Sequence, residues 1–214
     1  MADQIELTRS DATTAKLETV NPATGKAGKS YDPHTLDDAL AAAKAARAAY
    51  LNWRRTSFAQ RSEIIHKAAA ILRARQNELA RLMTEEMGKT VTDGRAEVEK
   101  CAFHCDWFAD HAEQYLARQP ADIGGGEAFV AFNPIGIVLA VMPWNFPFWQ
   151  VFRAAAPALM AGNGMLLKHA SNVPGCALAI EEVLHQAGVP NGLFRTLLLP
   201  TRHVEALIRD EHVA

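Results

Sequence analysis

The sequence lacks the features that mark secreted, membrane-spanning and nucleic-acid-binding proteins. It has only three cysteines in 214 residues, an odd number that builds no disulfide framework and suggests a reducing compartment. Its formal net charge is only −2, so it has no strong attraction to phosphate backbones or anionic lipid. Its first residues mix acidic and polar side chains and lack the apolar segment of a secretory signal. We therefore expect a cytoplasmic protein that binds neither nucleic acid nor membranes.

Charge is nearly absent from one long segment. Between Ala128 and Leu167 the only charged residue is Arg153. Prolines and asparagines nevertheless divide this segment into pieces shorter than the about 20 residues that a membrane span needs. The run Ile137–Met142 is apolar throughout, which is typical of a parallel strand buried on both faces. The segment is therefore predicted to form buried strands and helices.

Helical signals dominate the first half of the chain. The Thr35–Asp38 and Ser57–Gln60 pairs have the spacing of capping boxes, and each precedes apolar residues at helical spacing. Asn77 is expected to cap a third helix that ends before Gly88, and a fourth helix is expected over 91–118. Residues 1–34 are rich in turn signals, and the turn at 21–25 predicts a hairpin.

Strands alternate with helices in the second half. The strands are expected at 137–142, 165–168 and 193–199, and the helices at about 148–161, 174–187 and 202–209. This order is typical of βαβ units and predicts an α/β fold with a parallel sheet. Right-handed crossovers would place the first two of these helices on one face of the sheet, and the early helices are expected to cover the other. Three consecutive glycines, 124–126, are expected to join two extended arms, 121–123 and 127–132, into a hairpin.

The loop after the first predicted parallel strand is the candidate for chemistry. It reads Pro143-Trp144-Asn145-Phe146-Pro147, and ligands of open α/β sheets bind beyond the carboxyl ends of the strands. Two prolines restrict the backbone around Asn145, and a carboxamide fixed in advance can stabilise a developing oxyanion. An asparagine in a loop more often serves turn geometry, so the position alone leaves both interpretations open.

Taken together, these motifs resemble those of the NAD(P)-dependent aldehyde dehydrogenases. The resemblance covers nearly the whole chain and rests on several segments in order, namely 21–25, 86–89, 141–147, 162–164 and 166–171. The run Lys168-His169-Ala170 most resembles bacterial succinate-semialdehyde dehydrogenases within that family. The implied fold is an incomplete one, with a helical amino-terminal half, part of a Rossmann-like parallel sheet and a hairpin arm used in oligomers. Its parts would be residues 1–119 as the amino-terminal arm and helices, 120–135 as the hairpin of the oligomerisation region, and 136–214 as a partial dinucleotide-binding sheet.

The resemblance implies roles for four residues of the candidate site. Asn145 matches the amide that stabilises the oxyanion in that family. Trp144 falls on the loop that lines the nicotinamide ribose, and Lys168 matches a lysine that contacts the adenosine ribose, although many lysines are simply solvated. Ser171 stands where many members have a glutamate that repels a 2′-phosphate, so either NAD or NADP is admissible as cofactor.

Arg153 is the clue to the substrate. An arginine in such apolar surroundings normally has an anionic partner, and a guanidinium binds a carboxylate through two hydrogen bonds. We expect an aldehyde with a distal carboxylate, and the resemblance implies a carboxylate-binding arginine at this offset in succinate-semialdehyde dehydrogenases. The alternative is that Arg153 pairs with a carboxylate of another helix or subunit.

Departures from the family pattern limit what this chain could do alone. The general-base glutamate and nucleophilic cysteine of the family have no counterpart in it, and the glycine-rich dinucleotide fingerprint is absent. The cysteines and histidines at 101, 104, 105 and 111 spread over about 15 Å of helix, too far to share one zinc ion, and no metal is expected. We therefore expect aldehyde oxidation by a full-length, homo-oligomeric parent and none by the isolated chain. The alternative is a non-catalytic fragment that binds nucleotide or assembles with full-length subunits.

Overall fold

The computed structural model describes residues 15–214. The strands are β1 Leu17–Val20, β2 Ala27–Tyr31, β3 Gln119–Pro120, β4 Phe129–Val130, β5 Ile137–Met142, β6 Gly164–His169 and β7 Phe194–Thr196. The helices are α1 Leu36–Trp53, α2 Phe58–Ala74, α3 Gln76–Met87, α4 Val91–Tyr115, α5 Trp149–Met160, α6 Pro174–Ala187, the 3₁₀ turn η1 Thr201–His203 and α7 Val204–Ile208. The predicted α/β fold with a parallel sheet is confirmed.

Local capping signals place the starts of α1 and α2 correctly. The Thr35 hydroxyl accepts from the Asp38 amide at 3.1 Å and the Asp38 carboxylate accepts from the Thr35 amide at 2.9 Å, and Ser57 with Gln60 repeats this arrangement. The expected cap at Asn77 is wrong, because α2 ends at Ala74 and α3 begins at Gln76, so Arg75 alone separates the two helices. The fourth helix also ends earlier than expected, at Tyr115 rather than Arg118.

The parallel sheet has the order β5-β6-β7. Ile137 pairs with Gly164 and Met142 with His169, so β5 and β6 end at the same level. Every residue of β6 is buried, as expected for a central parallel strand. The third strand is shorter than the predicted 193–199, because only Phe194–Thr196 pairs with β6 in strand geometry. The last predicted helix divides into η1 and the short α7.

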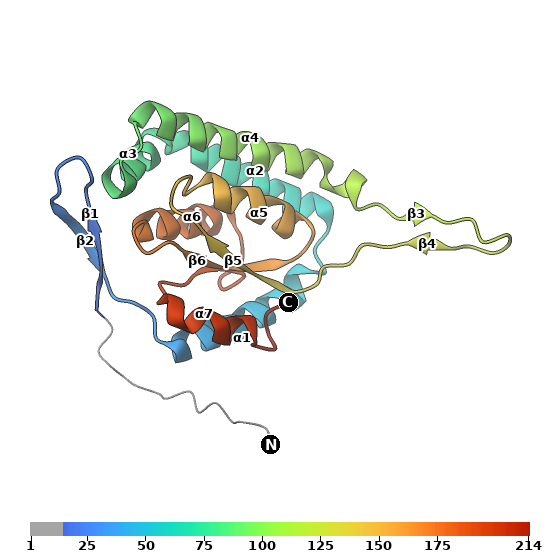
Figure 1. The fold of residues 1–214 in the computed structure, drawn as a ribbon. Helices are drawn as coiled ribbons and strands as arrows, with labels where there is room; N and C mark the ends of the chain where they lie inside the picture. The colour runs from blue at the N-terminus through green and yellow to red at the C-terminus, as the bar shows by residue number, and fades with distance from the viewer. Residues whose placement is uncertain (1–14) are drawn as a thin grey trace, which may run out of the picture.

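The helices form layers on both sides of the sheet (Figure 1). The crossover helices α5 and α6 lie on one face as expected, and α1 with α7 covers the other. The expectation that the early helices together cover that other face is wrong for α2, α3 and α4, which pack on the outer side of α5 and α6. The physical reason is that α6 buries residues all round its circumference, so it needs a second apolar neighbour besides the sheet.

Two antiparallel hairpins lie outside this body. The amino-terminal one, β1–β2, turns at Asn21, whose side-chain oxygen accepts from the Ala23 amide at 2.9 Å. The other pairs β3 with β4 and projects away from the helices in Figure 1. Its pairing involves Gln119 and Pro120 rather than the expected segment 121–123, although the Ala121 amide still donates to the Ala128 carbonyl at 2.9 Å.

The last described residues pair with the outer edge of β5. Val213 makes a parallel bridge to Ile137, and the Ala214 amide donates to the Ile137 carbonyl at 2.9 Å. The label C in Figure 1 accordingly lies beside the start of β5. Over residues 15–214, no helix combines the length and the apolar character that crossing a membrane requires.

Candidate functional site

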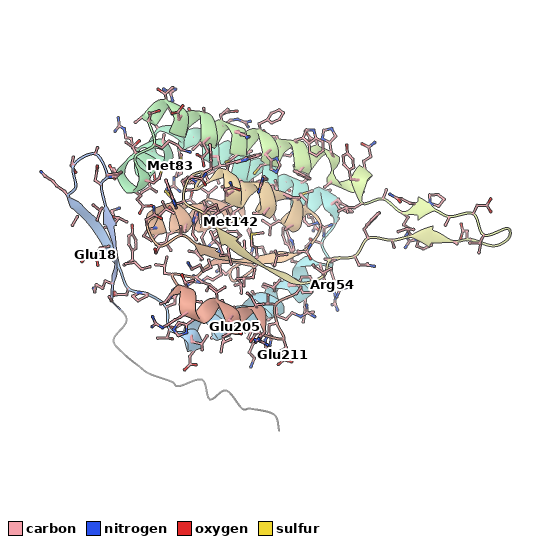
Figure 2. All side chains as sticks on the ribbon, in the orientation of Figure 1. Glu18, Arg54, Met83, Met142, Glu205 and Glu211 are labelled. Carbon is pink, nitrogen blue, oxygen red and sulfur yellow. The ribbon has the colours of Figure 1, made fainter. Side chains whose placement is uncertain are left out.

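The candidate site residues come together where β5 and β6 end. Met142 and His169 are the paired last residues of these strands, and Figure 2 labels Met142 at the end of β5. The loop that carries Trp144 and Asn145 follows β5, while Ser171 follows β6 and Lys168 is its penultimate residue. Parallel strands end at one edge, so the structure brings four of the five predicted residues to the same edge of the sheet.

Asn145 is available to a ligand. Its side chain is exposed and makes no hydrogen bond with any residue of the described range 15–214. The neighbouring Trp144 and Phe146 are 50% and 46% exposed, so apolar rings flank the carboxamide on both sides in the chain. The amide nitrogen of Asn145 can therefore donate to an oxygen brought to this edge.

Three side chains that sequence reasoning missed, Lys89, Glu97 and His169, fix the position of this loop. The backbone amides of Phe148 and Trp149 donate to the same oxygen of Glu97, each at 2.9 Å. Glu97 forms an ion pair with Lys89, and His169 donates from Nε2 to the Pro147 carbonyl at 2.9 Å. The partners lie far apart in the sequence, so a local pattern contains no signal for them.

Lys168 is a buried cation. Its exposed fraction is 7%, and its ammonium makes one long hydrogen bond, 3.4 Å, to the Thr201 hydroxyl. Burial lowers the pKa of Lys168, and within residues 15–214 no carboxylate forms an ion pair with it. The alternative of a solvated surface lysine therefore does not hold. A buried ammonium with spare donors fits an oxygen-rich ligand such as a nucleotide ribose, and exposed Ser171 follows three residues later.

Arg153 lies on α5 and is exposed, so its apolar sequence surroundings do not bury it. Over the described residues no carboxylate forms an ion pair with its guanidinium, and the expected partner is not in this part of the chain. Two further basic side chains from α4 gather near it around Trp149. The Lys100 ammonium lies 3.8 Å from the centroid of that ring, and the His104 ring centroid is 5.0 Å from it.

His104 connects this basic cluster to α5. Its Nε2 lies 3.4 Å from the Arg153 carbonyl oxygen, and burial, together with the charges of Lys100 and Arg153, lowers the pKa of His104. The three residues form a region that favours an anion over a cation. Lys100 and His104 are four residues apart on α4, and residues at this spacing lie on the same face of a helix. This spacing is the one sequence signal that could have indicated a shared face.

The three cysteines are buried in the core. Cys101, Cys105 and Cys176 are free and buried, and burial raises the pKa of all three thiols, which opposes thiolate chemistry. The two histidines near them have other partners, since His111 bonds the Trp107 carbonyl at 2.7 Å. Across residues 15–214, no group of three or more metal-ligating side chains is gathered.

Comparisons with known proteins agree on one family. A profile described as the aldehyde dehydrogenase family matches residues 8–214. A probable succinate-semialdehyde dehydrogenase [NADP(+)] of Synechocystis is 49% identical over 92% of this chain. The crystal structure of succinic semialdehyde dehydrogenase from Streptococcus pyogenes, in complex with NADP+, is 34% identical with a TM-score of 0.89, and covers 92% of this chain and 44% of that one. An NAD-dependent aldehyde dehydrogenase from Sinorhizobium meliloti is 30% identical with a TM-score of 0.87, over 94% and 41% of the two chains.

The matched relatives are much longer than this chain. It spans 43% of the Synechocystis protein's length, and the solved structures named above are covered to a similar extent. The matches therefore cover less than half of the length of each of these relatives.

Proposed function

Since the chain belongs to the aldehyde dehydrogenase family, we propose that it contributes to an enzyme that oxidises succinate semialdehyde to succinate with NAD or NADP. The observation that carries the substrate class is the exposed cation of Arg153, close to Lys100 and His104 and one helical turn beyond the start of α5. The names of the similar proteins from Synechocystis and Streptococcus pyogenes support the same substrate.

Asn145 has the electrophilic role in this proposal. Its carboxamide donates a hydrogen bond to the substrate carbonyl oxygen, which gains negative charge as a nucleophile adds to the carbon. The distal carboxylate of the substrate binds Arg153, which lies eight residues after Asn145. Arg153 lies one helical turn, a rise of about 6 Å, beyond the start of α5. The two contacts orient the aldehyde before reaction.

The cofactor would lie across the ends of β5 and β6. A dinucleotide held there would supply the hydride acceptor for the oxidation. Lys168 would donate to ribose hydroxyls, Trp144 would line the nicotinamide ribose, and Ser171 would leave room for a 2′-phosphate because it carries no negative charge. The buried, incompletely bonded ammonium of Lys168 supports this assignment.

The experiment uses the protein encoded by the complete reading frame that contains these residues. Reduced nicotinamide is measured with succinate semialdehyde and with butanal, which has the same chain length and no carboxylate, using NAD and NADP in turn. We expect kcat/KM to favour succinate semialdehyde by about 10- to 150-fold, since a hydrogen bond to a charged group contributes about 1.5–3 kcal/mol. Equal kcat/KM for both aldehydes, or no turnover of either, contradicts the proposal.

A second proposal concerns assembly. The hairpin formed by β3 and β4 exposes large apolar side chains, with Ile123 64%, Phe129 47% and Val130 51% exposed. Such side chains on a projecting arm favour contact with another subunit, and we propose that the arm takes part in a homo-oligomer in the cytoplasm, where the three free thiols stay reduced. Ile123→Asp with Val130→Asp should reduce the oligomer size measured by light scattering, whereas an unchanged size contradicts the role of the arm.

A further inference from the structure

Helix α5 begins without a cap of its own. The first backbone N–H groups of a helix have no partner inside the helix, and serine, threonine, aspartate or asparagine usually accepts from them. Phe148 occupies the cap position of α5 and makes no such side-chain bond. The amides of Phe148 and Trp149 donate instead to one oxygen of Glu97, which lies on α4 some 51 and 52 residues earlier.

Glu97 is buried but fully partnered. Its residue is 4% exposed, and a buried carboxylate is costly unless it is paired and hydrogen-bonded. The second carboxylate oxygen pairs with the ammonium of Lys89, and that ammonium lies 3.9 Å from the ring centroid of Phe146. The Lys89–Glu97 pair therefore contacts the loop on both sides of Pro147.

His169 closes the loop from the side of the sheet. Its Nδ1 accepts from the Ala170 amide at 2.8 Å, so the ring proton is on Nε2 and is donated to the Pro147 carbonyl at 2.9 Å. Burial lowers the pKa of His169, which keeps the ring in this neutral form. Consecutive residues 146–149 are thus each contacted by His169 of β6, by Glu97 of α4 or by Lys89, which precedes α4.

We propose that Glu97 is a positioning residue for Asn145, acting through the backbone of residues 146–149 together with Lys89 and His169. This inference rests on the proposed function of Asn145. The side chain of Asn145 has no partner of its own among residues 15–214, so its place depends on the backbone that follows it. An oxyanion donor must be in place before charge develops, and a shift of about 1 Å in such a group can cost about 100-fold in rate.

The first test needs no activity. Hydrogen–deuterium exchange of backbone amides is measured by NMR on the 214-residue chain and on Glu97→Gln. Exchange of the Phe148 and Trp149 amides should be at least about tenfold faster in the variant, because a neutral amide oxygen accepts more weakly than a carboxylate oxygen and the NH2 group of the glutamine would face the Lys89 ammonium, which has no acceptor. Glu99→Gln is the matched control, since this side chain lies on the same helix, is 48% exposed and pairs with Arg73 at 3.0 Å. Unchanged protection in Glu97→Gln overturns the inference.

A milder variant covers the case in which Glu97→Gln fails to fold. His169→Gln keeps a donor near the Pro147 carbonyl but leaves the Ala170 amide without its ring acceptor. It should speed exchange at residues 148 and 149 by less than Glu97→Asp, which keeps the charge and shortens the side chain. The inference is overturned if the Phe148 and Trp149 amides exchange at the same rate in both variants as in the parent.

The second test couples Glu97 to Asn145 in the protein from the complete reading frame. Asn145→Ala should lower kcat by about 100- to 1,000-fold, and Glu97→Gln by at least about tenfold with the dinucleotide Kd unchanged. In the Asn145→Ala background, Glu97→Gln should change kcat by less than twofold, because the group it positions is gone. Equal fold losses in both backgrounds overturn the inference alone. Wild-type kcat in Asn145→Ala refutes the proposed function of Asn145, whatever the exchange data show.

Discussion

Replacing Glu86 should destabilise the fold strongly although it lies on an outer helix. Glu86 is 5% exposed and caps α6 as Glu97 caps α5. Its two oxygens accept from the Gly175 and Cys176 amides at 2.8 and 2.9 Å. Helix α6 begins at Pro174 and has no side-chain cap of its own, so no neighbouring residue can take over these two bonds.

The magnitude follows from the two amides. Each buried N–H left without a partner costs about 1–3 kcal/mol, so Glu86→Ala places about 2–6 kcal/mol at risk. Part of this is offset, because burial raises the pKa of Glu86 and the variant no longer buries a carboxylate. We expect a net loss of about 3 kcal/mol. For a chain of this length that corresponds to a fall in Tm of about 6–12 °C.

Urea denaturation followed by tryptophan fluorescence measures this loss. The midpoint should fall in Glu86→Ala with little change in the slope of unfolding free energy against urea. Glu85→Ala is the matched control, because Glu85 is the preceding residue of α3 and is exposed. Its unfolding free energy should stay within about 0.5 kcal/mol of the parent. Equal midpoints for the two variants would refute the role of Glu86 as a cap.

Two further predictions concern titration and thiol reactivity. The two ring nitrogens of His66 face Asp106 and Asp110 at 2.8 and 3.0 Å; burial opposes the charged ring, but these hydrogen bonds outweigh it and the pKa of His66 is raised. His66 should therefore stabilise the protein relative to His66→Ala by no more than about 1 kcal/mol, because the pair is exposed. This stabilisation should be complete below the unfolded pKa of 6.5 and should be lost as pH rises through the folded pKa. A difference that is constant over that range in urea titrations argues against it. The three buried thiols should react slowly with a disulfide reagent in the native chain and rapidly in denaturant, and rapid native labelling of any of them speaks against the packing described.

Local signals in the sequence predict the elements well where the partners are close in the chain. The capping boxes at Thr35 and Ser57 involve residues three positions apart, and both helices begin where expected. The cap expected at Asn77 is wrong because α2 and α3 are nearly continuous through Arg75, whose amide still donates to the Ile71 carbonyl at 2.9 Å. A helix that continues its predecessor needs no capping residue of its own.

Sequence patterns do not predict the contacts between residues that lie far apart in the chain. The loop of Asn145 is predicted from its prolines and its place after a strand, but the bonds that hold it come from Glu97 and His169, 51 and 22 residues away from their partners. Arg153 is singled out by its isolation in an apolar segment, yet its exposure is not predicted. The apolar residues of α5 lie on the faces that pack on α4 and the sheet, whereas the face that carries Arg153 is exposed to solvent.

The most direct test of the central claim is the effect of Arg153→Leu on substrate choice in the protein from the complete reading frame. KM for succinate semialdehyde should rise by at least about tenfold while kcat/KM for butanal changes by less than twofold, because only the first substrate has a carboxylate for the guanidinium. Arg81→Leu, an exposed arginine on α3, is the control and should leave both values unchanged. Equal losses for both aldehydes in Arg153→Leu, or no loss for either, would contradict the claim that Arg153 binds the substrate's carboxylate.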